Sequence, residues 1–320
     1  YIDALMKERQ FETAEAALEK AKKFGVIEKK LSSYRQKLST ISHYVNTTDD
    51  EPLQKLFDKL AGYYQKRQYL DAEKLAVSIT QGFPEYQFGW KVLGAILTKT
   101  GRIKESLLPG QKSIQLAPHD AEAHNNLGVT LKELGRYKEA TEVYSQAIAL
   151  KPDYAEAHSN LGNTLQELRR LGEAEVSYRK AITFKPDFAE AYGNLGNTLK
   201  HLGRSQEASA SYSKALALNP KYTEARINLG NLLVEQGRLD EAIATYKQAL
   251  VLKPNYAKAY IGLGNAQRKG GRLAEAGVSY SQAITSNPDY AEAYYNLAIT
   301  LQEIGEVNDA EYNYKKAIAL

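Results

Sequence analysis

The chain has 320 residues, of which 25% are charged and 43% are hydrophobic, and its formal net charge is +4. It has no cysteine, which excludes disulfides and thiolate metal sites, and no apolar run approaches the ~18 residues that a membrane-spanning helix needs. Acidic and basic residues are interspersed along the chain, so we expect neither nucleic acid nor a membrane as the partner.

The N-terminal third is expected to be irregular. Residues 1–46 predict a helical segment, made of a degenerate repeat and a capping helix, because apolar residues recur there at helical spacing. The polar stretch at residues 47–52 ends in a proline and predicts a linker. Residues 53–120 predict two divergent copies of a repeating unit, and residues 121–320 predict a regular array whose last copy is incomplete.

The second divergent copy, residues 87–120, contains Pro109 and Gly110 in the middle of an expected helix. A proline inside a helix removes a hydrogen bond and clashes with the preceding turn, which costs about 3 kcal/mol unless the helix bends or breaks. We therefore expect this helix to be bent or interrupted near Leu108.

From Ala121 onward, a unit of 34 residues recurs, with copies that begin at residues 121, 155, 189, 223, 257 and 291. When positions are counted from the start of each copy, position 7 is always Leu, positions 20 and 27 are always Ala, and position 24 is always Tyr. A fixed period of this length indicates a stacked array. Small residues at fixed places allow close helix packing, so each copy predicts two antiparallel helices, over about positions 1–14 and 17–30.

Turn residues agree with this division. A proline at position 32 ends the second helix, and we expect the following aspartates to cap the next helix in capping boxes with a glutamate three residues later. These aspartates are Asp153, Asp187 and Asp289.

Glycine at position 15 suits a residue with left-handed backbone conformation at the end of the first helix. Arg169 occupies this position in one copy and should lower stability by ~1 kcal/mol relative to glycine. The stretch Lys269-Gly270-Gly271 predicts a shortened first helix in copy 257–290.

These residues, at positions 4, 7, 8, 11, 20, 24, 27 and 32, resemble the signature of the tetratricopeptide repeat family. The resemblance implies an all-α fold, a right-handed superhelical solenoid of antiparallel helix pairs. The recurring NLGN sequence at Asn160–Asn163, Asn194–Asn197 and Asn228–Asn231 is also similar to the repeat arm of O-linked N-acetylglucosamine transferases and to related bacterial proteins. We therefore expect a bacterial protein that acts in protein binding.

Catalytic motifs are missing from the sequence, which has no phosphate-binding loop, nucleophile elbow or HExxH. We expect no enzyme activity, no catalytic residue, no cofactor and no metal in this chain. His124 and His158 share position 4 of adjacent copies, so they should lie ~10 Å apart, too far to share a zinc ion with ligand bonds of ~2 Å. We interpret them as core or interface histidines.

A row of asparagines remains after the structural positions are assigned. It occupies positions 6 and 9, one turn apart on one face of the first helix, and comprises Asn126, Asn160, Asn163, Asn194, Asn197, Asn228, Asn231, Asn265 and Asn296. In the resembled family this helix lines a concave groove. A carboxamide both donates and accepts hydrogen bonds, so each asparagine could pair with a peptide unit in both directions. The alternative is that duplication copied these asparagines without a function.

The function that we expect is a scaffold that binds an extended peptide segment of a partner protein along this row. One alternative is a substrate-recruiting arm of a larger enzyme, similar to O-linked N-acetylglucosamine transferase, with its catalytic domain outside this chain. Another is a self-assembling scaffold that stacks through its repeat ends, where Tyr314 and Ile318 should present apolar surface. The chain begins without Met and stops inside a copy, so we expect a fragment of a longer, cytoplasmic protein.

Overall fold

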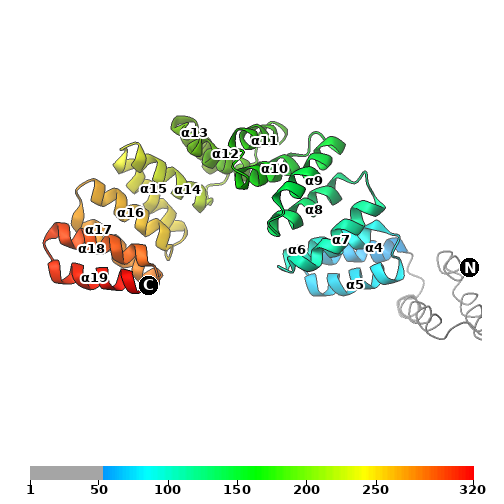
Figure 1. The fold of residues 1–320 in the computed structure, drawn as a ribbon, viewed down its shortest axis with the longest axis horizontal. Helices are drawn as coiled ribbons and strands as arrows, with labels where there is room; N and C mark the ends of the chain where they lie inside the picture. Colours follow the sequence, from blue (N-terminus) through cyan, green and yellow to red (C-terminus); the bar gives the residue numbers. More distant parts are fainter. Residues whose placement is uncertain (1–52) are drawn as a thin grey trace, which may run out of the picture. The chain divides into compact units, whose positions relative to one another are not determined.

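The computed structural model describes residues 53–320, and the segments 1–46 and 47–52 lie outside the described residues. Within residues 53–320 the chain forms sixteen α-helices and no strand (Figure 1). Their bounds are α4 Leu53–Gln65, α5 Tyr69–Gly82, α6 Gln87–Lys99, α7 Ile103–Leu116, α8 Ala121–Glu133, α9 Tyr137–Leu150, α10 Ala155–Glu167, α11 Leu171–Phe184, α12 Ala189–His201, α13 Ser205–Leu218, α14 Thr223–Glu235, α15 Leu239–Leu252, α16 Ala257–Lys269, α17 Leu273–Ser286, α18 Ala291–Ile304 and α19 Val307–Ala319.

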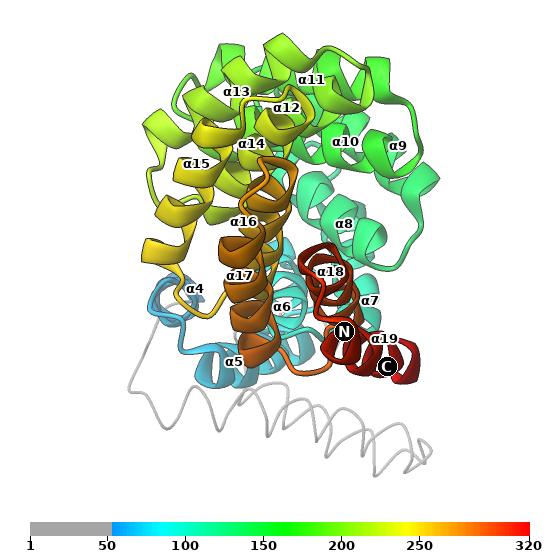
Figure 2. The same cartoon turned by 90° about the vertical axis from the view of Figure 1, so that its left-hand side faces the viewer.

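The chain divides after Thr164 into two compact units, which we call the first and the second unit. Apart from α10, which the division between the units crosses, the two helices of a copy pack against each other, and the second helix packs against the first helix of the next copy. Figure 2 shows this side-by-side arrangement for α16 with α17 and for α18 with α19. Even-numbered helices are the first helices of the copies and odd-numbered helices are the second ones. The expected all-α repeat solenoid is confirmed.

The core consists of the residues that recur. Tyrosine at position 24 is at most 1% exposed in the copies that begin at 121, 155, 189, 223 and 257. Its ring lies on the glycine at position 8: a Cβ atom on Gly128 would come within 2.5 Å of the Tyr144 ring, and one on Gly196 within 2.6 Å of the Tyr212 ring. Because no side chain fits between ring and backbone, the glycine brings the two helices of a copy together.

The turn inside each copy is left-handed at position 15, as expected. Gly135 has φ 73° and Gly237 has φ 74°, whereas Arg169 and Arg67 are the two non-glycine residues with positive φ in the described chain, both at 59°. A side chain in this region is strained by roughly 1 kcal/mol relative to glycine. The sequence analysis predicted this strain at Arg169 and missed it at Arg67.

The predicted aspartate caps are wrong. α12 has Phe188 at its N-cap and α18 has Tyr290, and neither helix receives a side-chain cap bond. The N–H of Phe188 donates to the carbonyl of Lys185 at 3.1 Å and closes a turn with Pro186 and Asp187 in its centre. Aspartate is favoured in such turns as well as at caps, so Asp187 and Asp289 belong to the turn. Asp153 likewise precedes α10, which begins at Ala155, by two residues.

Asp120 does cap a helix, and it occupies the position that holds Tyr or Phe in the later copies. Its carboxylate accepts hydrogen bonds from the N–H groups of Glu122 at 2.9 Å and Ala123 at 3.1 Å, at the start of α8. Lys91 on α6 also contacts this carboxylate, at 3.1 Å. The cap therefore joins α8 to the preceding copy.

The helix is not interrupted near Leu108, because α7 is continuous from Ile103 to Leu116 with Pro109 inside it; the alternative that we expected, a bend, stays a prediction. The carbonyl that Pro109 leaves without a helix partner belongs to Glu105, an exposed residue in the first turn. Water can bond to that carbonyl, so the carbonyl itself is not left unsatisfied. Gly94 and Gly110 face each other here, since a Cβ atom on Gly94 would lie 3.4 Å from the Gly110 nitrogen.

Copy 257–290 keeps a first helix of full length, because α16 and α12 both have 13 residues. The expected shortening is wrong since Gly270 and Gly271 lie in the turn, where Gly271 has φ 76°. The buried amide of Gln267 accepts a hydrogen bond from Ser279 at 2.6 Å and donates to Glu275 at 3.2 Å. These bonds explain how a polar residue occupies a place that holds leucine in other copies.

Candidate functional site

First helices of neighbouring copies contact one another directly in both units. These pairs are α4 with α6, α6 with α8, α12 with α14, α14 with α16, and α16 with α18. All nine predicted asparagines are half-buried, so each lies at the edge of the core and keeps contact with solvent. Asn126, Asn160 and Asn163 belong to the first unit and the other six to the second.

Position 9 asparagines hold the core tyrosines. The tyrosine hydroxyl of the same copy donates to the asparagine Oδ1 in three copies of the second unit. These bonds are Tyr212 to Asn197 at 2.7 Å, Tyr246 to Asn231 at 2.5 Å and Tyr280 to Asn265 at 2.7 Å. Each of these amide oxygens thus accepts a hydrogen bond inside the fold, whereas the three NH₂ groups donate to no other described residue. An amide oxygen can accept a second hydrogen bond, so the pairing of these side chains with a peptide stays a prediction.

Copy 121–154 shows why this bond matters. Position 9 of copy 121–154 is Val129, and the hydroxyl of Tyr144 is buried without a hydrogen-bond partner in the described residues. Burial raises the pKa of Tyr144 far above its usual range. In copy 155–188 the Tyr178 hydroxyl donates to Gln166 at 3.1 Å. The sequence carried a signal for this pairing that we missed, namely asparagine at position 9 and tyrosine at position 24 in the same copies.

Position 6 asparagines link consecutive copies. Asn228 Nδ2 donates to Asn197 Oδ1 at 2.9 Å, and Asn160 Nδ2 donates to Asn125 Oδ1 at 3.0 Å. Each bond joins two neighbouring first helices within one unit. Part of the row therefore stabilises the stacking of copies, which the sequence analysis did not foresee.

The row is broken at Gly262 for a packing reason. The ring and hydroxyl of Tyr246 lie so close to Gly262 that any side chain there would collide with them. The side-chain amides of Asn126 and Asn296, at the same position in other copies, make no hydrogen bond with another described residue. These two amides keep both donor and acceptor available.

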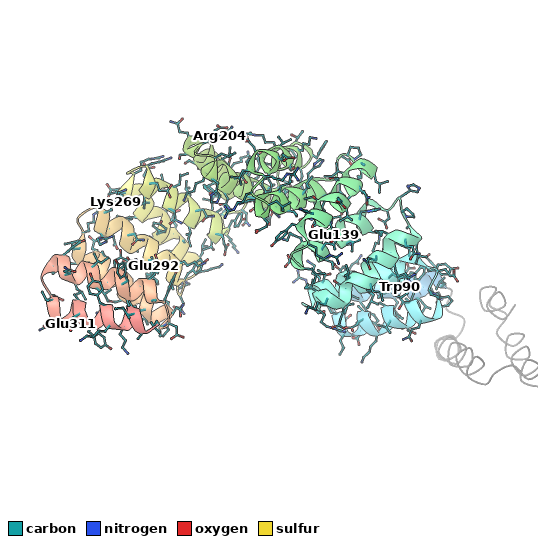
Figure 3. The ribbon with its side chains drawn as sticks, viewed as in Figure 1. Trp90, Glu139, Arg204, Lys269, Glu292 and Glu311 are labelled. Atoms are coloured by element: carbon teal, nitrogen blue, oxygen red, sulfur yellow. The ribbon has the colours of Figure 1, made fainter. Side chains whose placement is uncertain are left out.

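Position 4 side chains anchor the preceding turn. The Nε2 atoms of His124 and His158 lie 2.9 Å from the carbonyls of Pro118 and Pro152, and both histidines are buried. The Trp90 indole, labelled in Figure 3, donates to the Pro84 carbonyl at 2.8 Å in the same way. The interpretation of these histidines as structural is therefore supported by their contacts.

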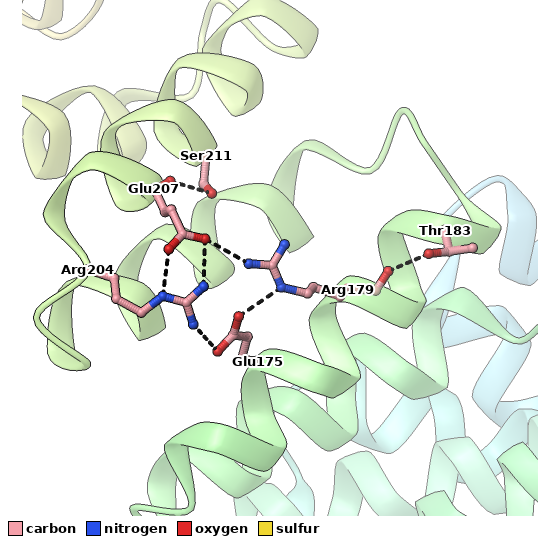
Figure 4. Close-up of polar contacts among 6 residues, drawn as sticks. All are labelled: Glu175, Arg179, Thr183, Arg204, Glu207 and Ser211. Atoms are coloured by element: carbon pink, nitrogen blue, oxygen red, sulfur yellow. Dashed lines mark hydrogen bonds and ion pairs between the residues drawn. The ribbon is translucent and has the colours of Figure 1, made fainter.

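Charged side chains join second helices on another side of the copies. In the second unit, Arg204 bonds both Glu207 and Glu175, and Arg179 bonds the same two carboxylates, which closes a ring between two copies (Figure 4). The hydrogen bonds from Arg204 lower the pKa of Glu207. All four charges are paired, so this ring presents no free charge to a ligand.

Among residues 53–320, no group of three or more His, Asp or Glu residues is placed to hold a metal ion. None of the helices in this range combines the length and apolarity that crossing a membrane requires.

Comparisons with known proteins identify the repeats. A family model described as TPR repeat matches residues 130–168, 230–269 and 264–305. Two models described as tetratricopeptide repeat match residues 155–188 and 189–222, and residues 110–142 and 211–244. Together these matches run without a gap from residue 110 to residue 305. No curated protein sequence matches the chain.

Solved structures share the fold. YrrB, described as a TPR protein with an unusual peptide-binding site, is 26% identical; the match covers 57% of this chain and 95% of YrrB with a TM-score of 0.50. PilF of Pseudomonas aeruginosa is 21% identical over 69% of this chain and 96% of that one, with a TM-score of 0.58. The Cut9–Hcn1 hetero-tetramer of the APC/C is 16% identical over 89% of this chain and 56% of that one, with a TM-score of 0.58.

Proposed function

Because the chain belongs to the tetratricopeptide repeat family, we propose that it binds an extended segment of a partner protein along the asparagine row of its first helices. Proteins of this family generally mediate protein–protein interaction. The likeness to YrrB, which is described as having a peptide-binding site, supports a peptide as the form of the ligand.

The observation that carries the proposal is the orientation of the position 9 amides in the second unit. The Oδ1 atoms of Asn197, Asn231 and Asn265 are bonded to tyrosine hydroxyls. The NH₂ groups of these amides are therefore the donors that a ligand could use. A row of donors matches the carbonyl oxygens of an extended chain, which every residue supplies whatever its side chain. Such a site binds many sequences in the same way.

The spacing of the row sets the length of the ligand. First helices of neighbouring copies pack ~10 Å apart, and an extended chain rises ~3.3 Å per residue. A peptide therefore meets one copy about every three residues. The second unit, with four first helices that carry row asparagines, would hold a segment of ~12 residues.

Self-assembly is a second candidate because of an apolar surface on α18 and α19. Val307 is 65% exposed, Tyr312 58% and Ile318 85%, so Ile318 presents apolar surface as expected. A second molecule of this protein could cover these side chains. The alternative that the chain is the substrate-recruiting arm of a larger enzyme stays a prediction. Such an arm would bind its substrate along the same asparagine row.

Selection followed by footprinting tests the proposed function. A displayed library of random 15-residue peptides is selected on the chain, and hydrogen exchange is measured with and without a selected peptide. Bound peptide should slow exchange in α12, α14 and α16 more than in α13, α15 and α17. Protection confined to the second helices, or failure to select any peptide, would contradict the proposal.

A further inference from the structure

One copy breaks the packing rule of all the later ones. In copy 87–120 the position that holds tyrosine in the later copies is Gly110, and it faces Gly94 at position 8. The ring that fills the space between helices in the later copies is therefore missing. The side chain of Leu127, from the next copy, approaches this space; a Cβ atom on Gly110 would lie 3.1 Å from its Cδ1.

A cavity remains where the ring is missing, and we call it the α6–α8 pocket. Gly94 and Ala95 of α6, Gly110 of α7, and Ala123 and Asn126 of α8 line it, and these three helices contact one another within the first unit. Its volume is about 10 Å³, which suffices for one water molecule or one methyl group. Ala95 and Asn126, at positions 9 and 6, place the mouth of the pocket on the asparagine row.

The polar groups of the pocket decide what it accepts. The Lys91 ammonium is held by Asp120 and Glu122 at 3.1 and 2.8 Å. The Ser113 hydroxyl accepts a hydrogen bond from Gln87 at 2.9 Å, and the Thr130 hydroxyl lies 3.1 Å from two other hydroxyls. Only the Asn126 amide lacks a partner among the described residues. The surface that lines the pocket is nevertheless mostly apolar, because the backbone and methyl groups of Gly94, Ala95, Gly110 and Ala123 make up most of it. A methyl group therefore fits this lining.

From this geometry we propose that the α6–α8 pocket is a specificity subsite that takes the methyl side chain of an alanine in the bound peptide. The alanine occupies the ligand residue whose backbone pairs with Asn126. The proposal rests on the proposed function, since the pocket is reached only by a ligand on the asparagine row. It gives the ligand a fixed register, which backbone recognition alone does not provide.

The expected discrimination is modest and directional. Burying one methyl group is worth about fourfold in affinity, so replacing the alanine by glycine should weaken binding by about fourfold. Valine exceeds the pocket volume and should weaken binding by more than glycine does.

The test uses peptides selected from the displayed library of random 15-residue sequences. Selected peptides that slow hydrogen exchange in α6 and α8 of the first unit should share one alanine, and its replacement by glycine should cost about fourfold. If no selected peptide protects α6 and α8, the pocket takes no part in binding. Ala95→Val fills the mouth of the pocket with a residue that the next copy already carries there, Val129, so the chain should fold normally. The Ala95→Val chain should bind the alanine and glycine peptides equally, whereas the matched control Ala95→Ser should keep the fourfold preference.

Each other outcome overturns the pocket proposal. If selected peptides share no alanine, or if Ala95→Val leaves the preference intact, the pocket plays no part in binding while the proposed function stands. If no peptide is selected at all, both the pocket and the proposed function are wrong.

Discussion

The hydroxyl of Tyr246 donates a hydrogen bond of 2.5 Å to Oδ1 of Asn231, from the second helix of a copy to its first. The tyrosine is 1% exposed, so its hydroxyl has no access to water. Replacing Asn231 by Val should therefore leave a buried donor unsatisfied and lower the free energy of unfolding by roughly 1–3 kcal/mol. Denaturant unfolding of single and double variants measures this effect. The double variant Asn231→Val/Tyr246→Phe should recover most of the loss, and a double variant as unstable as the single one would contradict the account.

Copy 121–154 offers the converse test, because the Tyr144 hydroxyl is buried without a partner beside Val129. Val129→Asn should supply the acceptor that the second unit uses and raise the free energy of unfolding by about 1 kcal/mol. In a Tyr144→Phe background the same substitution should give no gain. Equal effects in both backgrounds would show that the gain does not come from the hydroxyl.

Pro109 lies inside a continuous helix, so its removal should stabilise the chain. Pro109→Ala restores an N–H group that can bond the Glu105 carbonyl and removes a penalty of ~3 kcal/mol, but it loses two buried methylenes worth ~1.6 kcal/mol. The net expectation is a gain of about 1 kcal/mol, measured by thermal or denaturant unfolding. A clear loss of stability would mean that the proline ring is essential for packing against Gly94.

Because of Asp120, we expect part of the folding stability to depend on pH. Burial alone would raise its pKa, but the Ala123 N–H and the Lys91 ammonium outweigh burial, and the pKa of Asp120 lies below its usual range. A carboxyl with a lowered pKa stabilises the fold at neutral pH, and this contribution is lost as pH falls through the lowered pKa. Asn also caps helices well, so Asp120→Asn removes the charge and keeps the cap.

Thermal unfolding of both chains between pH 2 and pH 7 measures this difference. The parent should be the more stable chain above about pH 4, and the two curves should converge below it. In a Lys91→Met background the difference at neutral pH should shrink. A constant difference across the pH range would contradict the assignment of the effect to Asp120 ionisation.

The 34-residue period alone predicted much of the fold. It placed both helices of each copy and the left-handed residue at position 15, because glycine, alanine and tyrosine at fixed positions leave few packing arrangements. The aspartates could not be assigned in this way, since the same residue suits a helix cap and the centre of a turn. Phe188 decides the matter by closing the turn through its own N–H.

The candidate site was harder to predict than the fold. The asparagine row was visible in the sequence. Its hydrogen bonds, however, depend on contacts between residues of two packed helices that lie 15 positions apart in the chain, such as Tyr212 and Asn197. The α6–α8 pocket depends on two glycines, Gly94 and Gly110, that face each other only once α6 and α7 are packed. Both features are set by tertiary contacts that periodicity does not reveal.

The central claim is that the first helices bind peptide through the asparagine row, and the second unit allows the most direct measurement. A peptide selected from the random library is titrated calorimetrically into the parent and into the triple variant Asn194→Ala/Asn228→Ala/Asn296→Ala. Each lost hydrogen bond is worth ~0.5–1.5 kcal/mol, so the triple variant should bind at least about tenfold more weakly. Better helix propensity of alanine should largely offset the loss of the Asn228–Asn197 bond, leaving stability little changed.

A matched control removes three exposed side chains from second helices of the same unit, Lys214→Ala/Lys247→Ala/Gln282→Ala, and should bind like the parent. If the asparagine variant is folded and binds the peptide as tightly as the parent does, the position 6 asparagines of the second unit have no part in binding. The account predicts a tenfold loss in the asparagine variant and none in the control. The reverse pattern would place the binding surface on the second helices.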